Sequence, residues 1–196
     1  AEARIEHLAH HDKLTGLCNR HSLYDRLEQA LATAERLHTP LAVLFIDMDR
    51  FKSINDTFGH HVGDLLLIEI GERLKKNVRN SDIAARLGGD EFVIVLTTLE
   101  ASRDALPVAS KILDVLAEDY PLEGRTLHST PSIGISLYPD HLDADLLKEA
   151  AKDSNKDKQR ERAIEMLLKR ADTAMYHAKA QGRNNCQLFP PALLGN

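Results

Sequence analysis

The carboxylates that could do chemistry first appear at the end of an apolar run. Residues 41–46 are continuously apolar, and Asp47 and Asp49 follow them closely. Such a run is typical of a buried central strand. Because strand residues two apart face the same way, we expect both carboxylates to point into one crevice. An acidic residue at the end of a strand is often only solvated by water, so this pair alone is weak evidence for a functional site.

A second acidic pair lies on a predicted tight turn. The segment 88–91 reads Gly-Gly-Asp-Glu and separates the apolar segments 83–87 and 92–96, which is a hairpin pattern. If the hairpin neighbours the first strand, its acids meet Asp47, and such carboxylates repel one another unless a cation separates them. Hard oxygen ligands suit Mg²⁺, which takes phosphate oxygens as further ligands. An exposed hairpin tip would explain the turn alone equally well, but together with Asp47 it favours a metal site.

Cations and an amide suggest how a nucleotide could be held. Lys52 follows the first strand in a turn whose free backbone N–H groups could bind an anion, while Lys179 and Arg183 lie one turn apart near the end of a late helix. Cations there could equally complement the helix dipole. Asn55 and Asp64 offer the hydrogen-bonding groups that would recognise a guanine edge, although helix capping explains either residue in isolation.

The rest of the pattern predicts the elements that must position these groups. In chain order we expect a helix end at 1–10, a helix at about 21–37, a strand at 41–49, a turn or short helix from 51, a helix at 62–78, a hairpin at 83–96, a helix capped by Ser102 and running to about Glu118, a hairpin centred on Glu123-Gly124, a strand at 131–139, further helix, and a short strand at about 185–189. Mixed helices and hairpins argue for an antiparallel sheet with helices on one side.

Composition limits the class of protein. The chain has 196 residues, enough for one domain with a real core, and a formal net charge of −5, which argues against duplex nucleic acid as a partner. We find no apolar run long enough to cross a membrane and no signal peptide, and so expect no membrane contact by this segment. Two cysteines far apart in sequence fit a reducing compartment, so we expect a cytoplasmic domain.

A family resemblance emerges once the motifs are taken together. Residues 88–92 spell G-G-D-E-F, the signature of the GGDEF family, the diguanylate cyclases, and further segments resemble the family's motifs in the family's order from about residue 11 to 185. These segments are 12–20 (D-x-L-T-G-L-x-N-R), 45–56 (F-I-D-M-D-x-F-K-x-I-N-D), 59–64 (G-H-x-x-G-D), 132–135 (S-I-G-I) and 171–184 (A-D-x-A-M-Y-x-A-K-x-x-G-R-N).

The resemblance implies a fold and a domain plan. The fold would be α+β, like the core of nucleotidyl cyclases and palm-type polymerases: a mostly antiparallel five-stranded central sheet wrapped by helices, with an additional β-hairpin. The catalytic domain would span 11–189, after the end of a linker helix at 1–10 and before a tail at 190–196. A charged stretch at about 145–162 looks like an insertion, which we expect to be a solvated connector. A sensory or regulatory domain is expected upstream, and the full protein could be anchored in a membrane.

The resemblance also implies an activity with assigned residues. Two GTP would be condensed into cyclic di-GMP, with release of pyrophosphate, between the two subunits of a homodimer. The metal ligands for Mg²⁺, or Mn²⁺ in its place, would be Asp47, the Met48 carbonyl and Asp90, and the residues that help deprotonate the ribose 3′-hydroxyl would be Asp90 and Glu91. The residues that bind GTP would be Phe51, Lys52, Asn55, His60, Asp64, Lys179 and Arg183, and the signature hairpin would be Gly88, Gly89, Asp90, Glu91 and Phe92.

A regulatory site and two alternatives complete the expectations. Arg79 and Asp82 stand shortly before the hairpin and resemble the family's RxxD product-inhibition site, although a bare four-residue pattern would otherwise describe a surface pair. A degenerate domain that binds GTP or cyclic di-GMP without turnover is one alternative. An interaction module that binds no nucleotide is the other. The intact hairpin motif favours the enzyme.

Overall fold

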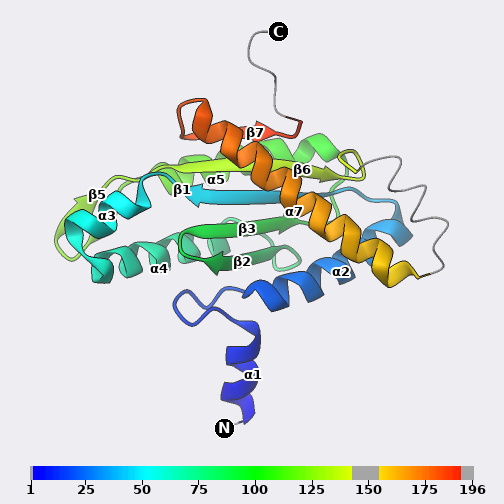
Figure 1. The fold of residues 1–196 in the computed structure, drawn as a ribbon, viewed down its shortest axis with the longest axis horizontal. Coiled ribbons are helices and arrows are strands. Elements are labelled where there is room, and N and C mark those ends of the chain that lie inside the picture. Colours follow the sequence, from blue (N-terminus) through cyan, green and yellow to red (C-terminus); the bar gives the residue numbers. More distant parts are fainter. Residues whose placement is uncertain (1, 143–154, 191–196) are drawn as a thin grey trace.

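The computed structural model of the chain describes residues 2–142 and 155–190. Its elements follow the predicted order closely (Figure 1). They are α1 (Glu2–His10), α2 (Arg20–Leu37), β1 (Leu41–Met48), α3 (Phe51–Phe58), α4 (His60–Lys76), β2 (Ile83–Gly88), β3 (Glu91–Leu96), the 3₁₀ turn η1 (Ser102–Asp104), α5 (Ala105–Ala117), β4 (Tyr120–Leu122), β5 (Arg125–Leu127), β6 (Pro131–Tyr138), α7 (Lys156–Ala180) and β7 (Asn185–Leu188).

The central sheet has five strands in the order β2-β3-β1-β6-β7. The middle strand, β1, pairs antiparallel with both β3 and β6, while the edge strand β7 runs parallel to β6. The separate β4–β5 hairpin is centred on Glu123 and Gly124, as the sequence predicts. This arrangement confirms the mostly antiparallel sheet with an additional hairpin, which is the nucleotidyl cyclase palm fold.

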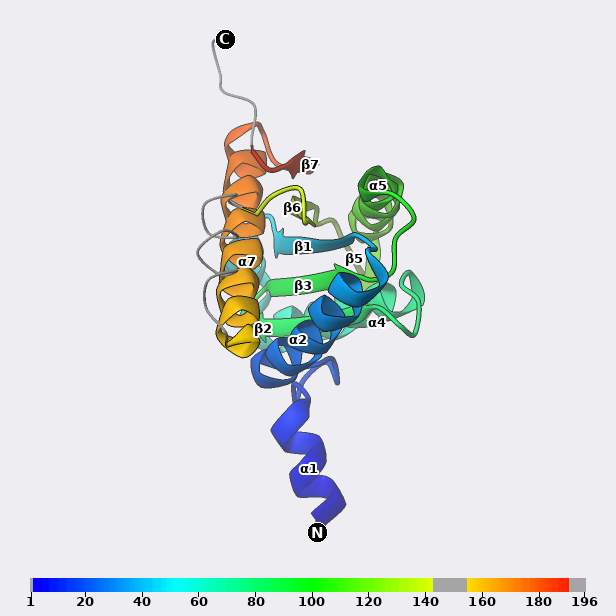
Figure 2. The same ribbon diagram turned by 90° about the vertical axis from the view of Figure 1, so that its right-hand side faces the viewer.

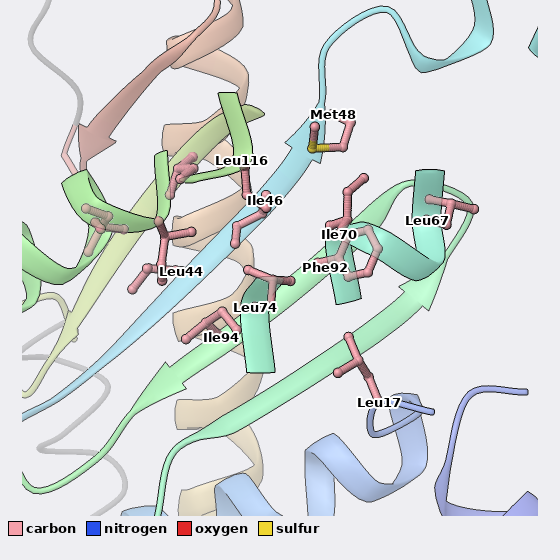
Figure 3. Packing of buried hydrophobic residues seen from close by; sticks show 14 of the residues in the cluster. Leu17, Leu44, Ile46, Met48, Leu67, Ile70, Leu74, Phe92, Ile94 and Leu116 are labelled. Atoms are coloured by element: carbon pink, nitrogen blue, oxygen red, sulfur yellow. The ribbon is translucent and has the colours of Figure 1, made fainter. Parts of the chain in front are cut away.

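Helices cover both faces of the sheet, which confirms the wrapped sheet implied by the resemblance, whereas the expectation of helices on one side, drawn from the pattern of elements, was wrong (Figure 2). Alternate β1 residues point to opposite layers: Leu44 and Ile46 pack with α4 and α5, whereas Val43 and Phe45 pack with α2 and α7. Figure 3 shows the first of these layers, in which Ile70 of α4 lies against the strands. A continuously apolar strand is what two-sided burial requires.

The long helix α7 crosses the sheet in direct contact with β6. A Cβ atom placed on Gly134 would lie 2.0 Å from the Ala171 carbonyl oxygen, so only glycine allows this approach. Ser132 and Ser136 flank Gly134 on the same face of β6, and the Ser136 hydroxyl donates to the Leu167 carbonyl of α7 at 2.7 Å. The small residues of β6 therefore set where α7 lies, and with it the polar groups near its C-terminal end.

Three parts of the chain differ from the sequence expectations or lie partly outside the described residues. Ser102 does not cap the helix that follows, because it lies in η1 and donates to Asp140 at 3.0 Å, while the Asp104 carboxylate accepts the Ala101 N–H at 2.9 Å. The charged stretch at about 145–162 was predicted as an insertion. Its residues up to 154 lie outside the described part of the chain, and its last residues form the start of α7. The predicted tail lies outside the described residues from 191 onward.

No helix in the described part of the chain is long and apolar enough to cross a bilayer.

Candidate active site

Asp47 stands one residue before the end of β1, where the sheet brings three segments together. It pairs in register with Glu91 of β3 and with Ser132 of β6. Strand alternation puts Asp47 on the face that α7 covers, and there its Oδ2 lies 2.7 Å from the Nζ of Lys179. Its Oδ1 is buried and has no hydrogen-bond partner among the described residues. A buried carboxylate oxygen without a donor is costly, so this oxygen marks a place where a cation could bind.

The signature hairpin delivers Asp90 beside this carboxylate, as predicted. Gly88 and Gly89 have φ angles of 149° and 50°, and these positive values are ones that glycine adopts without steric cost. Burial is the largest cause that raises the pKa of Asp90, to about 7, and the adjoining Asp47 carboxylate adds to it, while Lys179 opposes the shift. Two carboxylates are therefore held together with too little positive charge between them.

An ion pair fixes the turn of this hairpin from outside. Arg86 donates through Nε to the Gly89 carbonyl at 2.9 Å and through Nη1 to Asp12 at 2.9 Å. Asp12 in turn accepts the Thr15 N–H and hydroxyl at 2.9 and 2.7 Å. The loop that follows α1 is thus tied to the turn that carries Asp90.

Glu91 and Asp172 extend the acidic cluster. The pKa of Glu91 is raised by burial first and then by Asp47 and Asp172, against the lowering effect of Arg20 and Lys179. The pKa of Asp172 is raised by burial and by Asp47. Sequence analysis missed Asp172 as a site residue. The sequence does hold one indication of this role: Asp172 lies seven residues before Lys179, which is two helical turns along the same face of α7.

The residues present fit a magnesium ion. No group of three or more His, Cys, Asp or Glu side chains among the described residues forms a ready metal cage. The candidate set is instead two carboxylates, Asp47 and Asp90, with the backbone carbonyl of Met48, and this all-oxygen set leaves positions for water or phosphate. The unpartnered Asp47 oxygen and the raised pKa of Asp90 both report a local deficit of positive charge.

Asn55 and Asp64 lie where α3 meets α4. Asn55 Oδ1 is buried without a partner in the described part of the chain, and a Cβ atom on Gly63 would fall 1.8 Å from it. Glycine at position 63 therefore makes room for the Asn55 amide, and the exposed Asp64 is the next residue. Phe51 also packs against this glycine, whereas His60, the first residue of α4, is exposed. The structure thus places Asn55 against Gly63, the residue before Asp64.

The predicted phosphate-binding residues fall into two groups. Lys179 contacts Asp47, whereas Arg183 lines a cavity of about 500 Å³ together with Arg50 and Asp49. Arg50 has a left-handed backbone (φ 58°), and its side chain makes no capping hydrogen bond to α3, which follows, so the first amides of α3 could bind an anion. Lys52 is exposed on the first turn of this helix.

Asp49, the other carboxylate of the predicted pair, has different surroundings from Asp47. β1 ends at Met48, and the Asp49 carboxylate accepts hydrogen bonds from the hydroxyls of Thr130 and Ser132, both at 2.6 Å, and from the Asn184 N–H at 3.1 Å. These bonds give both of its oxygens a partner within the protein.

Comparison with known proteins decides the family. A sequence model described as "Diguanylate cyclase, GGDEF domain" matches residues 9–164. The chain belongs to this family. Residues 165–190, which include Lys179 and Arg183, lie beyond the matched range.

Individual GGDEF proteins are similar over nearly the whole chain. The bifunctional diguanylate cyclase/cyclic di-GMP phosphodiesterase MucR of Pseudomonas aeruginosa is 43% identical over 196 residues, which are 100% of this chain and 26% of MucR. Diguanylate cyclase TpbB of the same species is 42% identical over 187 residues, 95% of this chain and 39% of TpbB. This GGDEF domain therefore spans well under half the length of these two curated relatives.

Solved structures agree in fold. The GGDEF domain of TpbB from P. aeruginosa has a TM-score of 0.78 at 42% identity, over 91% of this chain and 94% of that chain. The GGDEF domain of DgcB from Caulobacter crescentus, solved in complex with c-di-GMP, has a TM-score of 0.75 at 26% identity, over 92% and 93% of the two chains.

The RxxD segment of this GGDEF domain forms a closed pair. Asp82 is buried and accepts the backbone N–H groups of Arg79 and Thr97 at 2.9 and 3.0 Å. The Arg79 guanidinium donates to the same carboxylate at 3.2 Å and also to the Thr97 carbonyl, yet its side chain remains 56% exposed. The arginine thus faces solvent, whereas both carboxylate oxygens are engaged inside the fold.

Proposed function

We propose that this domain is a diguanylate cyclase, which joins two GTP into cyclic di-GMP and releases two pyrophosphates. The observation that carries the proposal is the position of Asp90, in the turn before β3, beside Asp47 of β1, which contacts Lys179 and has one buried carboxylate oxygen without a partner among the described residues. Membership of the GGDEF family and the names of MucR and TpbB support it.

Asp47, Asp90 and the Met48 carbonyl would hold Mg²⁺, or Mn²⁺ in its place. When bound, the ion would neutralise phosphate charge and polarise the α-phosphate toward attack. Lys179 stabilises the negative charge of the cluster and the phosphates that enter it. Glu91 and Asp90 are the carboxylates placed to accept the proton of the attacking ribose 3′-hydroxyl, because their surroundings raise both pKa values toward the working pH.

The triphosphate would bind the open amides at the start of α3, with Lys52 and Arg183 supplying positive charge. Guanine would be recognised by Asn55 and Asp64, with His60 nearby. The buried Asn55 Oδ1 needs a donor, and guanine offers N1–H and the N2 amino group as donors on its Watson–Crick edge. Adenine presents an N1 lone pair there instead, which would face carboxylate and amide oxygens.

The working unit would be a homodimer. One domain has one candidate substrate site, yet the product joins two nucleotides through two equivalent bonds. Two domains facing each other across a twofold axis would offer each 3′-hydroxyl to the partner's α-phosphate. Since GTP is an intracellular nucleotide, we propose a cytoplasmic location. The share of MucR and TpbB that the chain covers supports a longer protein with a regulatory domain, reached through α1.

Product inhibition would act through the RxxD segment. The exposed Arg79 guanidinium could stack on a base or pair with a phosphate of cyclic di-GMP. Asp82 would hold this arginine in place, and could contact the ligand directly only by giving up some of its internal bonds.

The test is incubation of the chain with GTP and MgCl₂, followed by chromatography of the products. We expect cyclic di-GMP from GTP, at least about 10⁴-fold less product from ATP, and no product with chelator. Specific activity should rise with protein concentration, because dimers form by mass action. Binding of GTP without any dinucleotide would indicate a receptor, and equal use of ATP would overturn the roles of Asn55 and Asp64.

A further inference from the structure

The carboxylate of Asp49 joins two chain segments that the proposed phosphate site needs. Asp49 is 5% exposed and directly precedes Arg50, the residue before α3. Its Oδ2 accepts the N–H of Asn184 at 3.1 Å, and Asn184 directly follows Arg183. One buried carboxylate therefore connects the loop that opens α3 with the turn that carries Arg183, although Asp49 and Asn184 are 135 residues apart in sequence.

Both connected segments have unfavourable backbone conformations. Arg50, Arg183 and Asn184 have φ angles of 58°, 67° and 48°, in the left-handed region that costs free energy for residues other than glycine. Such conformations persist only where surrounding bonds fix them. For the turn after α7, the bond from the Asn184 N–H to Asp49 is one of these, and the Asn185 side chain supplies two more to the carbonyls of Ala178 and Arg183.

The sheet anchors Asp49 itself. Its N–H donates to the Thr130 carbonyl at 2.7 Å, and the hydroxyls of Thr130 and Ser132 donate to its two carboxylate oxygens at 2.6 Å. Ser132 is fully buried on β6. Asp49 is thus fixed from the sheet side and holds the turn on its other side.

We propose that Asp49 is a positioning residue for the nucleotide triphosphate. It keeps the α3 amides and the Arg183 guanidinium in one arrangement, so that both contact the same phosphate chain. This inference rests on the proposed function, because it assumes that these groups bind phosphate. Asp49 is not assigned as a metal ligand: unlike Asp47, both of its oxygens already accept hydrogen bonds from the protein.

The variant Asp49→Asn tests the proposal, since the amide nitrogen keeps the shape but cannot accept a hydrogen bond. Two affinities are measured on the full chain: one for a GTP analogue with a non-hydrolysable α,β bridge, by calorimetry, and one for guanosine, by NMR titration. We expect the affinity for the analogue to fall at least about tenfold, because a charge-assisted bond is lost. The affinity for guanosine should stay unchanged, since Asn55 and Asp64 do not contact Asp49. The KM for GTP should rise more than kcat falls.

A matched pair of serine variants separates positioning from stability. Ser132 and Ser136 are both fully buried on β6 and make hydrogen bonds of 2.6 and 2.7 Å, but only Ser132 contacts Asp49. Ser132→Ala should weaken binding of the analogue about threefold. Ser136→Ala should lower the melting temperature without weakening that binding. This pair also decides the question if Asp49→Asn does not fold.

The outcomes distinguish the two proposals. If the wild-type chain binds guanosine but no GTP analogue, or neither, the proposed function fails and the role of Asp49 fails with it. If the wild type binds the analogue and Asp49→Asn binds it equally well, only the positioning role is overturned. An equal loss of guanosine and analogue affinity would also overturn it, because it would indicate general damage to the site.

Discussion

Two carboxylate sites of this domain, one buried and one half-buried, have opposite surroundings. Asp82 has a side chain that is 2% exposed, and it accepts two backbone N–H groups and a guanidinium. Asp47 has a side chain that is 16% exposed and contacts Lys179 through one oxygen, while the other oxygen has no partner among the described residues. Asp90 beside it has its pKa raised to about 7, chiefly by burial and then by Asp47.

The difference separates a carboxylate that the fold satisfies from a pair whose charge the fold leaves incompletely balanced. Native proteins satisfy nearly all buried polar groups, so an unsatisfied group needs another explanation. Asp82 is explained by the fold alone, since its bonds connect the start of β2 to the end of β3. The pair of Asp47 and Asp90 is not, because the fold brings two negative groups together and leaves the charge incompletely balanced. A bound cation with its phosphate ligands would complete the balance.

The largest expected effect is the loss of activity in Asp90→Ala. Synthesis of cyclic di-GMP should fall by at least about 10²–10³-fold, because a preorganised charge contact is removed. The melting temperature should not fall, since the lost carboxylate is one that its surroundings disfavour in the charged form. Initial rates and thermal unfolding check both expectations.

Asp82→Ala is the matched control and should behave in the opposite way. It leaves the N–H groups of Arg79 and Thr97 without their acceptor, which should lower the free energy of unfolding by about 1–3 kcal/mol.

Normal turnover by a folded Asp90→Ala protein would refute the metal-site assignment. A melting temperature lowered equally in both variants would remove the contrast between the two sites.

A smaller effect is expected at the RxxD segment. Arg79→Ala should keep the initial rate, and the concentration of cyclic di-GMP that halves the rate should rise by about 5–150-fold, which is the usual range of a coupling between two sites. Progress curves with added product, and with pyrophosphate removed, measure this. Arg103→Ala removes a charge from another exposed arginine, on η1, and should leave the inhibition unchanged. If product does not inhibit the wild type, the segment is only structural here.

Sequence patterns predicted the elements that carry Asp47 and Asp90, because local chemistry determines them. The apolar run of β1 predicts a strand and the Gly88-Gly89 turn predicts a hairpin, so the two carboxylates were expected to meet if the hairpin neighboured the strand. The roles of Asp49 and Asp172 could not be predicted in this way. The bonds of Asp49 depend on Asn184, which is 135 residues away, and the position of Asp172 depends on how α7 crosses Gly134.

The layering of the fold followed from the family resemblance but not from the pattern of elements, for a similar reason. A continuously apolar strand shows that both faces are buried, but it does not say which helices bury them. The parallel pairing of β7 with β6 is likewise a consequence of where α7 ends. Such features depend on contacts between distant elements, to which local periodicity is insensitive.

Asp12 provides the smallest and most specific test, because its carboxylate has hydrogen-bond partners within the protein but is only partly buried. Burial alone would raise its pKa, but hydrogen bonds from Thr15 and the charge of Arg86 outweigh burial and lower the pKa below 3.8. A carboxylate with a lowered pKa stabilises the fold above its unfolded pKa, and this contribution is lost as the pH falls through the folded pKa. Asp12→Asn should therefore lower the free energy of unfolding by about 1 kcal/mol at about pH 7, and the difference from wild type should shrink below about pH 4. Urea unfolding of both proteins across this range measures the difference. A pH-independent deficit would mean that the variant disturbs packing around Arg86, and that the charge of Asp12 contributes nothing of its own.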